Sequence, residues 1–245
     1  MKELRNFTMA RVGIGRAGNS LPTRELLDFQ LAHARARDAV HFALDSAAIQ
    51  SELEAQGWET IIAHSAARGR SEYLRRPDLG RRLSSESRAK LENVTLEKLP
   101  GEFDVVFAIA DGLSALAVHR HAVELLGHVR ERVSGRIAPV VIAEQARVAL
   151  SDDIGAALNA SLAVMLIGER PGLSSPYSLG AYLTWSPRPG RTDAGRNCIS
   201  NIRPEGMSTA AAAELLIMLM TAARARQISG VTLSSEIASR GMIGT

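Results

Sequence analysis

The spacing of apolar residues changes near residue 100 of the 245-residue chain. Upstream of that point the pattern is helical. After Ser20, a candidate N-cap, apolar residues recur every three or four positions and so lie on one face of a helix. That face comprises Leu26, Phe29, His33, Ala36, Val40 and Ala43. A lone histidine on such a face is more often a packed side chain than a ligand. We therefore predict a helical N-terminal region over residues 1–100.

Downstream of Pro100-Gly101, short apolar runs alternate with longer helical patterns. The candidate strands are residues 103–110, 137–143, 162–167 and 181–185. The candidate helices are residues 115–133, 152–159 and 209–227. Such alternation favours a mostly parallel sheet with helices on its faces. The predicted fold class is α/β, with the sheet domain over residues 101–245.

The composition is compatible with several classes of protein and partner. A hydrophobic content of 46% is typical of a globular protein, and the net charge is +3 with a pI near 9.4. An arginine-rich surface suits an anionic ligand, nucleic acid or an acidic partner, but ordinary solvated arginines give the same composition. The single cysteine excludes an internal disulfide, so we expect a reducing cytoplasm. The longest apolar tract, residues 207–225, contains Glu214, which favours a buried helix over a membrane span.

Polar residues follow the first three predicted strands of the sheet domain. In an open α/β sheet, ligands bind beyond the carboxyl ends of the strands. The carboxylates at these ends are Asp111, Glu144 and Glu169, and nearby glycines allow close backbone approach. A ligand-binding crevice is therefore expected there. Glu169 has a structural alternative, pairing with Arg170 or a helix end, and Cys198, placed in a polar turn, has the alternative of a small buried hydrophobe.

Other motifs carry little chemistry. Gly13, Gly15 and Gly18 match a dinucleotide fingerprint with Asp38 beyond them, but a strand before the motif is missing and a helical pattern surrounds the aspartate. The sequence lacks a G-x-S-x-G elbow, a G-K-[ST] phosphate loop and zinc-ligand spacing. His119 and His121, two apart on a helix, are expected on different faces at the surface. We predict no protein-bound metal.

The basic segment at residues 75–82 has the charge of a nucleic-acid site. Its middle contains Asp78, however, and Tyr73 is the only aromatic residue near it, whereas single-strand binding sites interleave aromatic and basic residues. We therefore expect no nucleic-acid partner. Arginine's planar fork would instead serve a subunit contact or an anionic group.

Several segments resemble one family, the small (light) subunit of ethanolamine ammonia-lyase. They are GERPG at 168–172, CISNI at 198–202, DGLS at 111–114, YLRRPDLGRRL at 73–83 and a long match from Gly15 to Val40. The resemblance covers nearly the whole chain. It implies a Rossmann-like domain in a carbon–nitrogen lyase that uses adenosylcobalamin to convert ethanolamine into acetaldehyde and ammonia. It also implies that the large subunit is the partner and binds ethanolamine, so this chain supplies no catalytic residue.

The resemblance further implies three cofactor-binding residues: Val148 in the ARV segment, Glu169 in GERPG and Cys198 in CISNI. A carboxylate can accept hydrogen bonds from the amides that fringe cobalamin, while the other two supply small apolar contacts. The D-x-H-x-x-G signature of proteins that ligate cobalt through histidine does not occur. The expected mode is therefore base-on, with no protein ligand to cobalt. For the basic segment, the family suggests a loop at a subunit contact or near the cofactor.

Two other functions stay open. One is a free-standing binding module for another nucleotide-like ligand, which would bind without a partner. The other is a purely structural partner subunit, whose assembly would not depend on cobalamin; the helices predicted near both termini leave room for large contacts. Some family members carry a longer leading segment that directs the enzyme into a bacterial microcompartment. This chain enters the family core almost at once, so the sequence leaves a microcompartment location open, as it does the stoichiometry.

Overall fold

The strands of this protein form a six-stranded sheet in the order β1-β3-β2-β4-β5-β6. A computed structural model describes residues 11–94 and 102–239. The strands are β1 (Thr60–His64), β2 (Val106–Ala110), β3 (Val140–Glu144), β4 (Leu162–Gly168), β5 (Leu179–Trp185) and β6 (Arg196–Ile202). The first four in the spatial order are parallel, and β5 and β6 each run antiparallel to the strand before them. The predicted α/β class with a mostly parallel sheet is confirmed.

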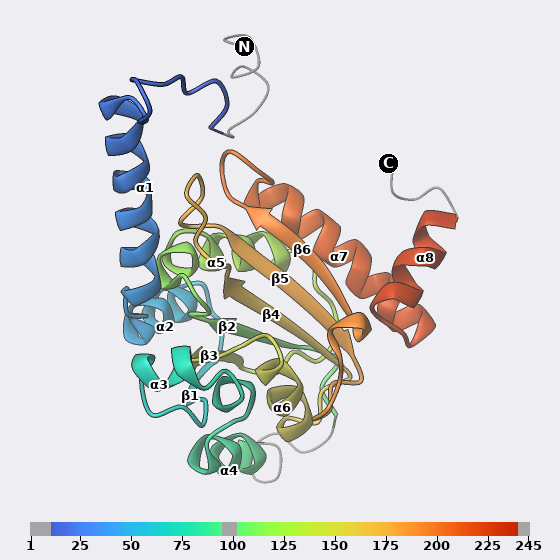
Figure 1. The fold of residues 1–245 in the computed structure, drawn as a ribbon. Coiled ribbons are helices and arrows are strands. Elements are labelled where there is room, and N and C mark those ends of the chain that lie inside the picture. Colours follow the sequence, from blue (N-terminus) through green and yellow to red (C-terminus); the bar gives the residue numbers. More distant parts are fainter. Residues whose placement is uncertain (1–10, 95–101, 240–245) are drawn as a thin grey trace.

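Helices lie on both faces of the sheet (Figure 1). They are α1 (Thr23–His41), α2 (Ser46–Ala55), α3 (Arg70–Arg75), α4 (Ser85–Asn93), α5 (Ala115–Arg130), α6 (Leu150–Ala157), α7 (Thr209–Arg226) and α8 (Val231–Ser239), with short 3-10 turns at Leu79–Arg81 and Asp193–Gly195. Buried side chains of α2, α5 and α7 join the core cluster on one face, and those of α4 and α6 join the cluster on the other.

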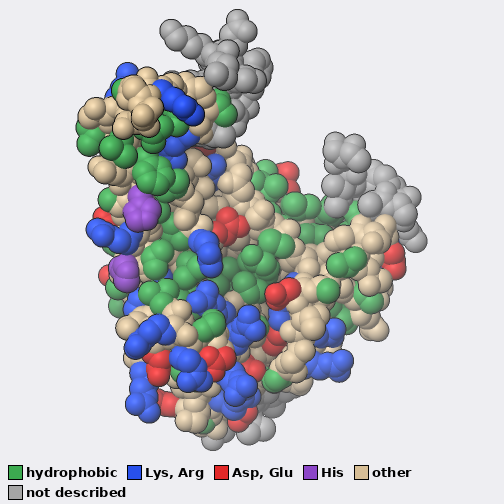
Figure 2. Space-filling view, in the orientation of Figure 1, with side chains coloured by type: hydrophobic (Ala, Val, Ile, Leu, Met, Phe, Trp, Pro, Cys, Tyr) green, Lys and Arg blue, Asp and Glu red, His purple; other side chains and the backbone are tan. Residues whose placement is uncertain are grey.

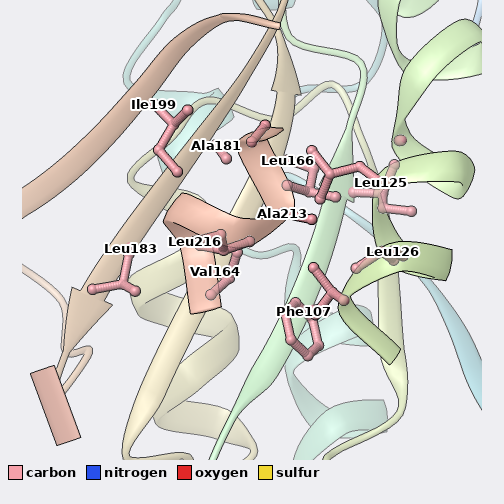
Figure 3. Close-up of a cluster of buried hydrophobic side chains, with 14 of the residues drawn as sticks. Phe107, Leu125, Leu126, Val164, Leu166, Ala181, Leu183, Ile199, Ala213 and Leu216 are labelled. Carbon is pink, nitrogen blue, oxygen red and sulfur yellow. The ribbon is translucent and has the colours of Figure 1, made fainter. Parts of the chain in front are cut away.

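The central strand β4 shows why these residues fold this way. All seven of its residues are buried, as expected for a strand covered on both faces. Leu162, Val164 and Leu166 point into the cluster beneath α5 and α7, which Figure 3 shows in close-up. The alternate residues, such as Met165, point into the cluster beneath α6. The two-residue period of the strand thus divides one apolar run between two cores.

The structure differs from the sequence prediction in three elements and one cap. Strand β1 lies in the segment expected to be helical, and it joins the sheet at the edge beside β3. Strand β6 and helix α8 were not predicted. Helix α1 begins at Thr23 with Pro22 at the cap position, so Ser20 does not cap it. The boundary expected at residues 100–101 lies outside the described residues, and a division into two domains there stays a prediction.

The sheet is wider than the layer of helices on one of its faces. Helix α6 packs on β2 and β4, whereas the packing of β5 and β6 is against each other, β4 and the helices of the opposite face. Figure 1 shows β5 and β6 with no helix in front of them. On β6, Cys198 and Ser200 are exposed while Ile199 between them is buried. One face of the β5–β6 pair, which we call the open face, is therefore accessible in this chain.

Helix α1 is the most exposed helix of the N-terminal region. Ala39 is its buried residue, and Leu26 and Phe29 of its predicted apolar stripe are each 41% exposed. In Figure 1 the helix extends along one side of the sheet, away from the core. Its apolar stripe is thus not part of the core of this chain.

A buried ion pair ties the antiparallel strands to α6. The Arg196 guanidinium on β6 donates to both carboxylate oxygens of Asp152 on α6, at 2.7 and 2.6 Å, and also to the Thr184 hydroxyl at 3.0 Å. The Arg196 and Asp152 side chains are each 2% exposed. Removing one member of such a pair leaves an unpaired buried charge, which is costly.

We therefore expect Arg196→Met to lower the free energy of unfolding by about 3–5 kcal/mol, because Asp152 keeps its charge without a partner. Urea denaturation followed by circular dichroism measures this change. The matched control is Arg132→Met, whose partner Glu214 is 66% exposed and whose loss should cost about 1 kcal/mol or less. Equal losses in the two variants would contradict a structural role for the buried pair.

Candidate functional site

The structure places the three predicted cofactor-binding residues on one side of the sheet. Val148 precedes α6 and packs against the core cluster beneath that helix. Glu169 directly follows β4, and Cys198 lies on β6 opposite Tyr182 of β5. Tyr182 packs against the same cluster as Val148 and interacts electrostatically with both Glu169 and Cys198. The three positions thus surround the open face.

The prediction that Cys198 lies in a polar turn is wrong. Cys198 belongs to β6, and its side chain is exposed, which also removes the alternative of a buried hydrophobe. Partial desolvation of the sulfur and the nearby Glu169 carboxylate raise the pKa of the Cys198 thiol, while a hydrogen bond from the Tyr182 hydroxyl acts in the opposite direction. The side chain therefore presents a neutral thiol on the open face.

The Glu169 carboxylate is fixed by groups of the neighbouring strands. The Ser178 hydroxyl donates to one of its oxygens, and the Asn201 amide lies 3.3 and 3.4 Å from its two oxygens. The Glu169 backbone amide also donates to the Ser178 carbonyl at 2.9 Å. Within the described residues these contacts, rather than a pair with Arg170, hold the side chain. A partly exposed carboxylate is therefore held at the end of the open face.

The absence of a side chain at Gly180 leaves room for the Glu169 carboxylate. A Cβ atom at Gly180 would lie 3.1 Å from Glu169 Oε1 and 3.1 Å from Tyr182 Cε2. Both contacts are tighter than side chains normally make, so an alanine would displace one neighbour. The missing side chain lets Glu169 and Tyr182 approach each other across β5.

The crevice expected at the ends of β2 and β3 is filled by the chain itself. The fully buried Tyr73 of α3 donates to the carbonyls of Gly112 and Ala146, at 2.9 and 3.0 Å. Arg70 donates to Asp111 at 3.0 Å and to Gly112 at 2.9 Å. In the described chain, Tyr73 and Arg70 therefore occupy the space directly beyond these two strand ends, and a ligand site at the loops around it stays a prediction. Glu144, the third strand-end carboxylate, accepts a hydrogen bond from Ser46 of α2.

Tyr73 and Arg70, which we call the plug, also help to position the turn that carries Val148. Asp111 accepts a hydrogen bond from the Ala146 amide at 3.0 Å, and the Arg147 amide donates to Gly80 at 2.8 Å. The Arg147 guanidinium lies 4.3 Å from the centroid of the Tyr73 ring. Gly80 belongs to the basic segment, which thus packs against this turn. Burial raises the pKa of the Asp111 carboxyl to about 6, although the Ala146 amide and Arg70 favour its charged form.

Of the two histidines of α5 that were predicted at the surface, His119 and His121, one is buried. His119 accepts a hydrogen bond from the Asp45 amide at 3.0 Å, but His121 is buried, so its expected surface position is wrong. Burial lowers the pKa of His121. The physical reason is that the segment at Tyr177 lies against His121, whose ring interacts with the Tyr177 backbone. In the described part of the chain, no group of His, Cys, Asp and Glu is arranged to hold a metal ion.

Comparison with known proteins identifies the family. The family model for "Ethanolamine ammonia-lyase light chain (EutC)" matches residues 1–234. The chain belongs to this family. It is a subunit of ethanolamine ammonia-lyase, a carbon–nitrogen lyase.

Relatives named "Ethanolamine ammonia-lyase small subunit" agree with this assignment. The relative from Pseudomonas syringae pv. tomato is 56% identical over 237 residues, covering 96% of this chain and 82% of that protein. The relative from Ralstonia nicotianae is 56% identical over 233 residues, covering 94% and 86%. The relative from Pseudomonas fluorescens Pf0-1 is 54% identical over 237 residues, covering 96% and 86%. The family match therefore spans both the N-terminal helices and the sheet of this ethanolamine ammonia-lyase subunit.

Tyr182 and Gly180 were missed in the sequence. Tyr182 lies in a strand that was predicted, but its position on the open face depends on the pairing of β5 with β6. Because β6 was not predicted, the strand pattern gave no indication of this face.

We expect the stability contribution of Asp111 to depend on pH. Its pKa is about 6 in the folded chain against an ordinary value of 3.8. The folded chain thus binds more protons between these values, and stability falls as the pH rises through them. Asp111→Asn removes this dependence. The free energy of unfolding of the variant, relative to that of the parent, should therefore increase by roughly 3 kcal/mol at most as the pH rises from about 4 to about 7.

Urea denaturation of both proteins across this pH range measures the difference. Asp38→Asn is the control, because the Asp38 side chain is 75% exposed. A difference between Asp111→Asn and the parent that stays constant with pH would contradict the raised pKa.

Proposed function

We propose that this chain is the cobalamin-binding small subunit of an adenosylcobalamin-dependent ethanolamine ammonia-lyase. The observation that carries the proposal is that Val148, Glu169 and Cys198 surround one open sheet face although they lie far apart in the sequence. Family membership supports the lyase reaction, and the position of these three residues supports a cofactor role for this chain.

The side chains fit the chemistry of cobalamin. Its corrin ring is wide and apolar with amide groups at the edge, so a binding face needs apolar contacts and a few hydrogen-bond acceptors. Glu169 offers carboxylate oxygens, while Val148 and the neutral thiol of Cys198 offer small apolar contacts. The missing side chain of Gly180 lets the carboxylate lie beside Tyr182. Since none of the three is a histidine, we propose the base-on mode without a cobalt ligand from this chain.

The roles within the enzyme follow from this arrangement. Adenosylcobalamin, when bound, supplies the radical that begins the reaction of ethanolamine to acetaldehyde and ammonia. This chain binds and orients the cofactor, and we assign it no catalytic residue. Ethanolamine is bound by the large subunit. The name "small subunit" of the relatives supports such a partner.

Helix α1 is the surface that we propose for the large subunit. Large apolar side chains exposed together on a soluble protein commonly mark an interaction site. On this helix they are Leu26, Leu27, Phe29 and Leu31, which are 41–57% exposed. A groove of about 540 Å³ runs between α1, α5 and the loop at residues 173–177. Figure 2 shows hydrophobic side chains on this helix and in the hollow beside it.

For the location in the cell, we propose the cytoplasm, based on the single free cysteine. No helix among residues 11–94 and 102–239 is both long and apolar enough to cross a membrane. A microcompartment location is not part of the proposal.

The direct test is reconstitution. We expect acetaldehyde release from ethanolamine only when this chain, the large subunit and adenosylcobalamin are mixed, and not when either protein is left out. Glu169→Ala should raise the dissociation constant of cobalamin about tenfold to a hundredfold, because hydrogen bonds to a charged group are lost. Glu214→Ala, at an exposed site on α7, should leave it unchanged. An inactive mixture in which the two subunits demonstrably associate would contradict the proposal and favour a structural or other-ligand role.

Assembly has its own prediction. Replacing both Leu27 and Leu31 by Glu should raise the dissociation constant for the large subunit by at least about tenfold, because two apolar contacts are replaced by buried charges. Analytical ultracentrifugation of the mixed subunits measures this. Val231→Glu, at a 64% exposed position on α8, is the control. Unchanged assembly of the α1 variant would show that the large subunit binds elsewhere.

A further inference from the structure

Tyr182 lies at the centre of the open face. It is the residue of β5 that pairs with Cys198 of β6, and its side chain is partly buried. The ring packs against the cluster beneath α6, as Val148 does. Tyr182 thus lies beside Cys198, interacts with Glu169 and packs against the same core cluster as Val148.

Its contacts with two of them are close. Tyr182 faces Cys198 across the β5–β6 pair, and the Tyr182 hydroxyl and the Cys198 thiol interact electrostatically. On the other side, Gly180 is two residues away on the same strand face, and a Cβ atom there would touch both the Tyr182 ring and Glu169 Oε1 at 3.1 Å. Glu169, Tyr182 and Cys198 therefore follow one another across adjacent strands without a gap for another side chain. A ligand as wide as a corrin ring that contacts both Glu169 and Cys198 must also cover Tyr182.

The chemistry of a tyrosine suits this position. A phenol ring offers a large, rigid apolar surface with a polar group at its end. Burial raises the pKa of Tyr182, with further contributions from Cys198 and Glu169, so the hydroxyl stays a neutral donor at physiological pH. Donation from this hydroxyl to the Cys198 sulfur would orient the thiol.

We propose that Tyr182 is a fourth cofactor-contact residue of this subunit, whose ring packs against cobalamin between Glu169 and Cys198. The inference rests on the proposed function. It assigns the ring to binding and the hydroxyl to the orientation of Cys198. A purely structural role would instead confine Tyr182 to covering the cluster beneath α6.

Two variants separate these roles. Tyr182→Phe keeps the ring and its packing but removes the hydroxyl, and Tyr182→Leu removes the ring. Trp185→Leu is the matched control, because Trp185 lies on the same strand but packs against the opposite core cluster. All variants are assembled with the large subunit, and the binding of cyanocobalamin to each complex is measured by equilibrium dialysis.

We expect Tyr182→Leu to raise the dissociation constant of cyanocobalamin about tenfold. Tyr182→Phe should raise it about threefold, because one neutral hydrogen bond is lost. Trp185→Leu should bind as the parent does. Urea denaturation and subunit assembly, measured in parallel, restrict the comparison to variants that fold and associate.

The outcomes distinguish this inference from the proposed function. If the parent binds cyanocobalamin and Glu169→Ala weakens binding, but Tyr182→Leu binds as tightly as the parent, the inference about Tyr182 is wrong and the proposed function stands. Should Tyr182→Leu fail to fold, Tyr182→Met takes its place, because it also lacks the ring, and an unchanged dissociation constant for that variant overturns the inference. A parent complex that does not bind cyanocobalamin overturns both.

Discussion

The structure depends on a difference in width: on one face, the six-stranded sheet extends beyond the helices that cover it. Parallel strands β1 to β4 are covered on both faces, which is the usual requirement of parallel sheets. The antiparallel strands β5 and β6 extend the sheet beyond α6, and the buried Arg196–Asp152 pair fixes them to that helix. One face of this extension has no covering helix in the described chain. The candidate cofactor site occupies this face.

The plug at the strand ends explains why the site lies on a face rather than in a crevice. In many open α/β sheets the ligand enters between strands whose connections run to opposite faces. Here Tyr73 and Arg70 occupy that position and hydrogen-bond to the loops after β2 and β3. The same contacts hold the turn that presents Val148 beside the open face. A region that binds ligands in other folds therefore has a structural role in this chain.

The sequence predicted the features that depend on local patterns and missed those that depend on contacts between residues far apart in the chain. Strands β2 and β4 were predicted because continuous apolar runs are buried on both faces. Strand β6 contains both buried and exposed residues without a regular period, and its polar positions suggested a turn. The filling of the strand-end crevice depends on contacts between Tyr73 and residues 39 and 73 positions away, which no local pattern indicates. The three cofactor positions came from family resemblance, and their common face became visible only with the pairing of β5 and β6.

The central claim is that cobalamin binds on the open face of β5 and β6. The most direct measurement is an electron cryomicroscopy structure of the complete enzyme, this chain with the large subunit, in the presence of cyanocobalamin. The account predicts density for the corrin ring in contact with Val148, Glu169 and Cys198, between this face and the partner. Density at the carboxyl ends of β2 and β3, in place of Tyr73, or against the opposite face of the sheet would contradict it.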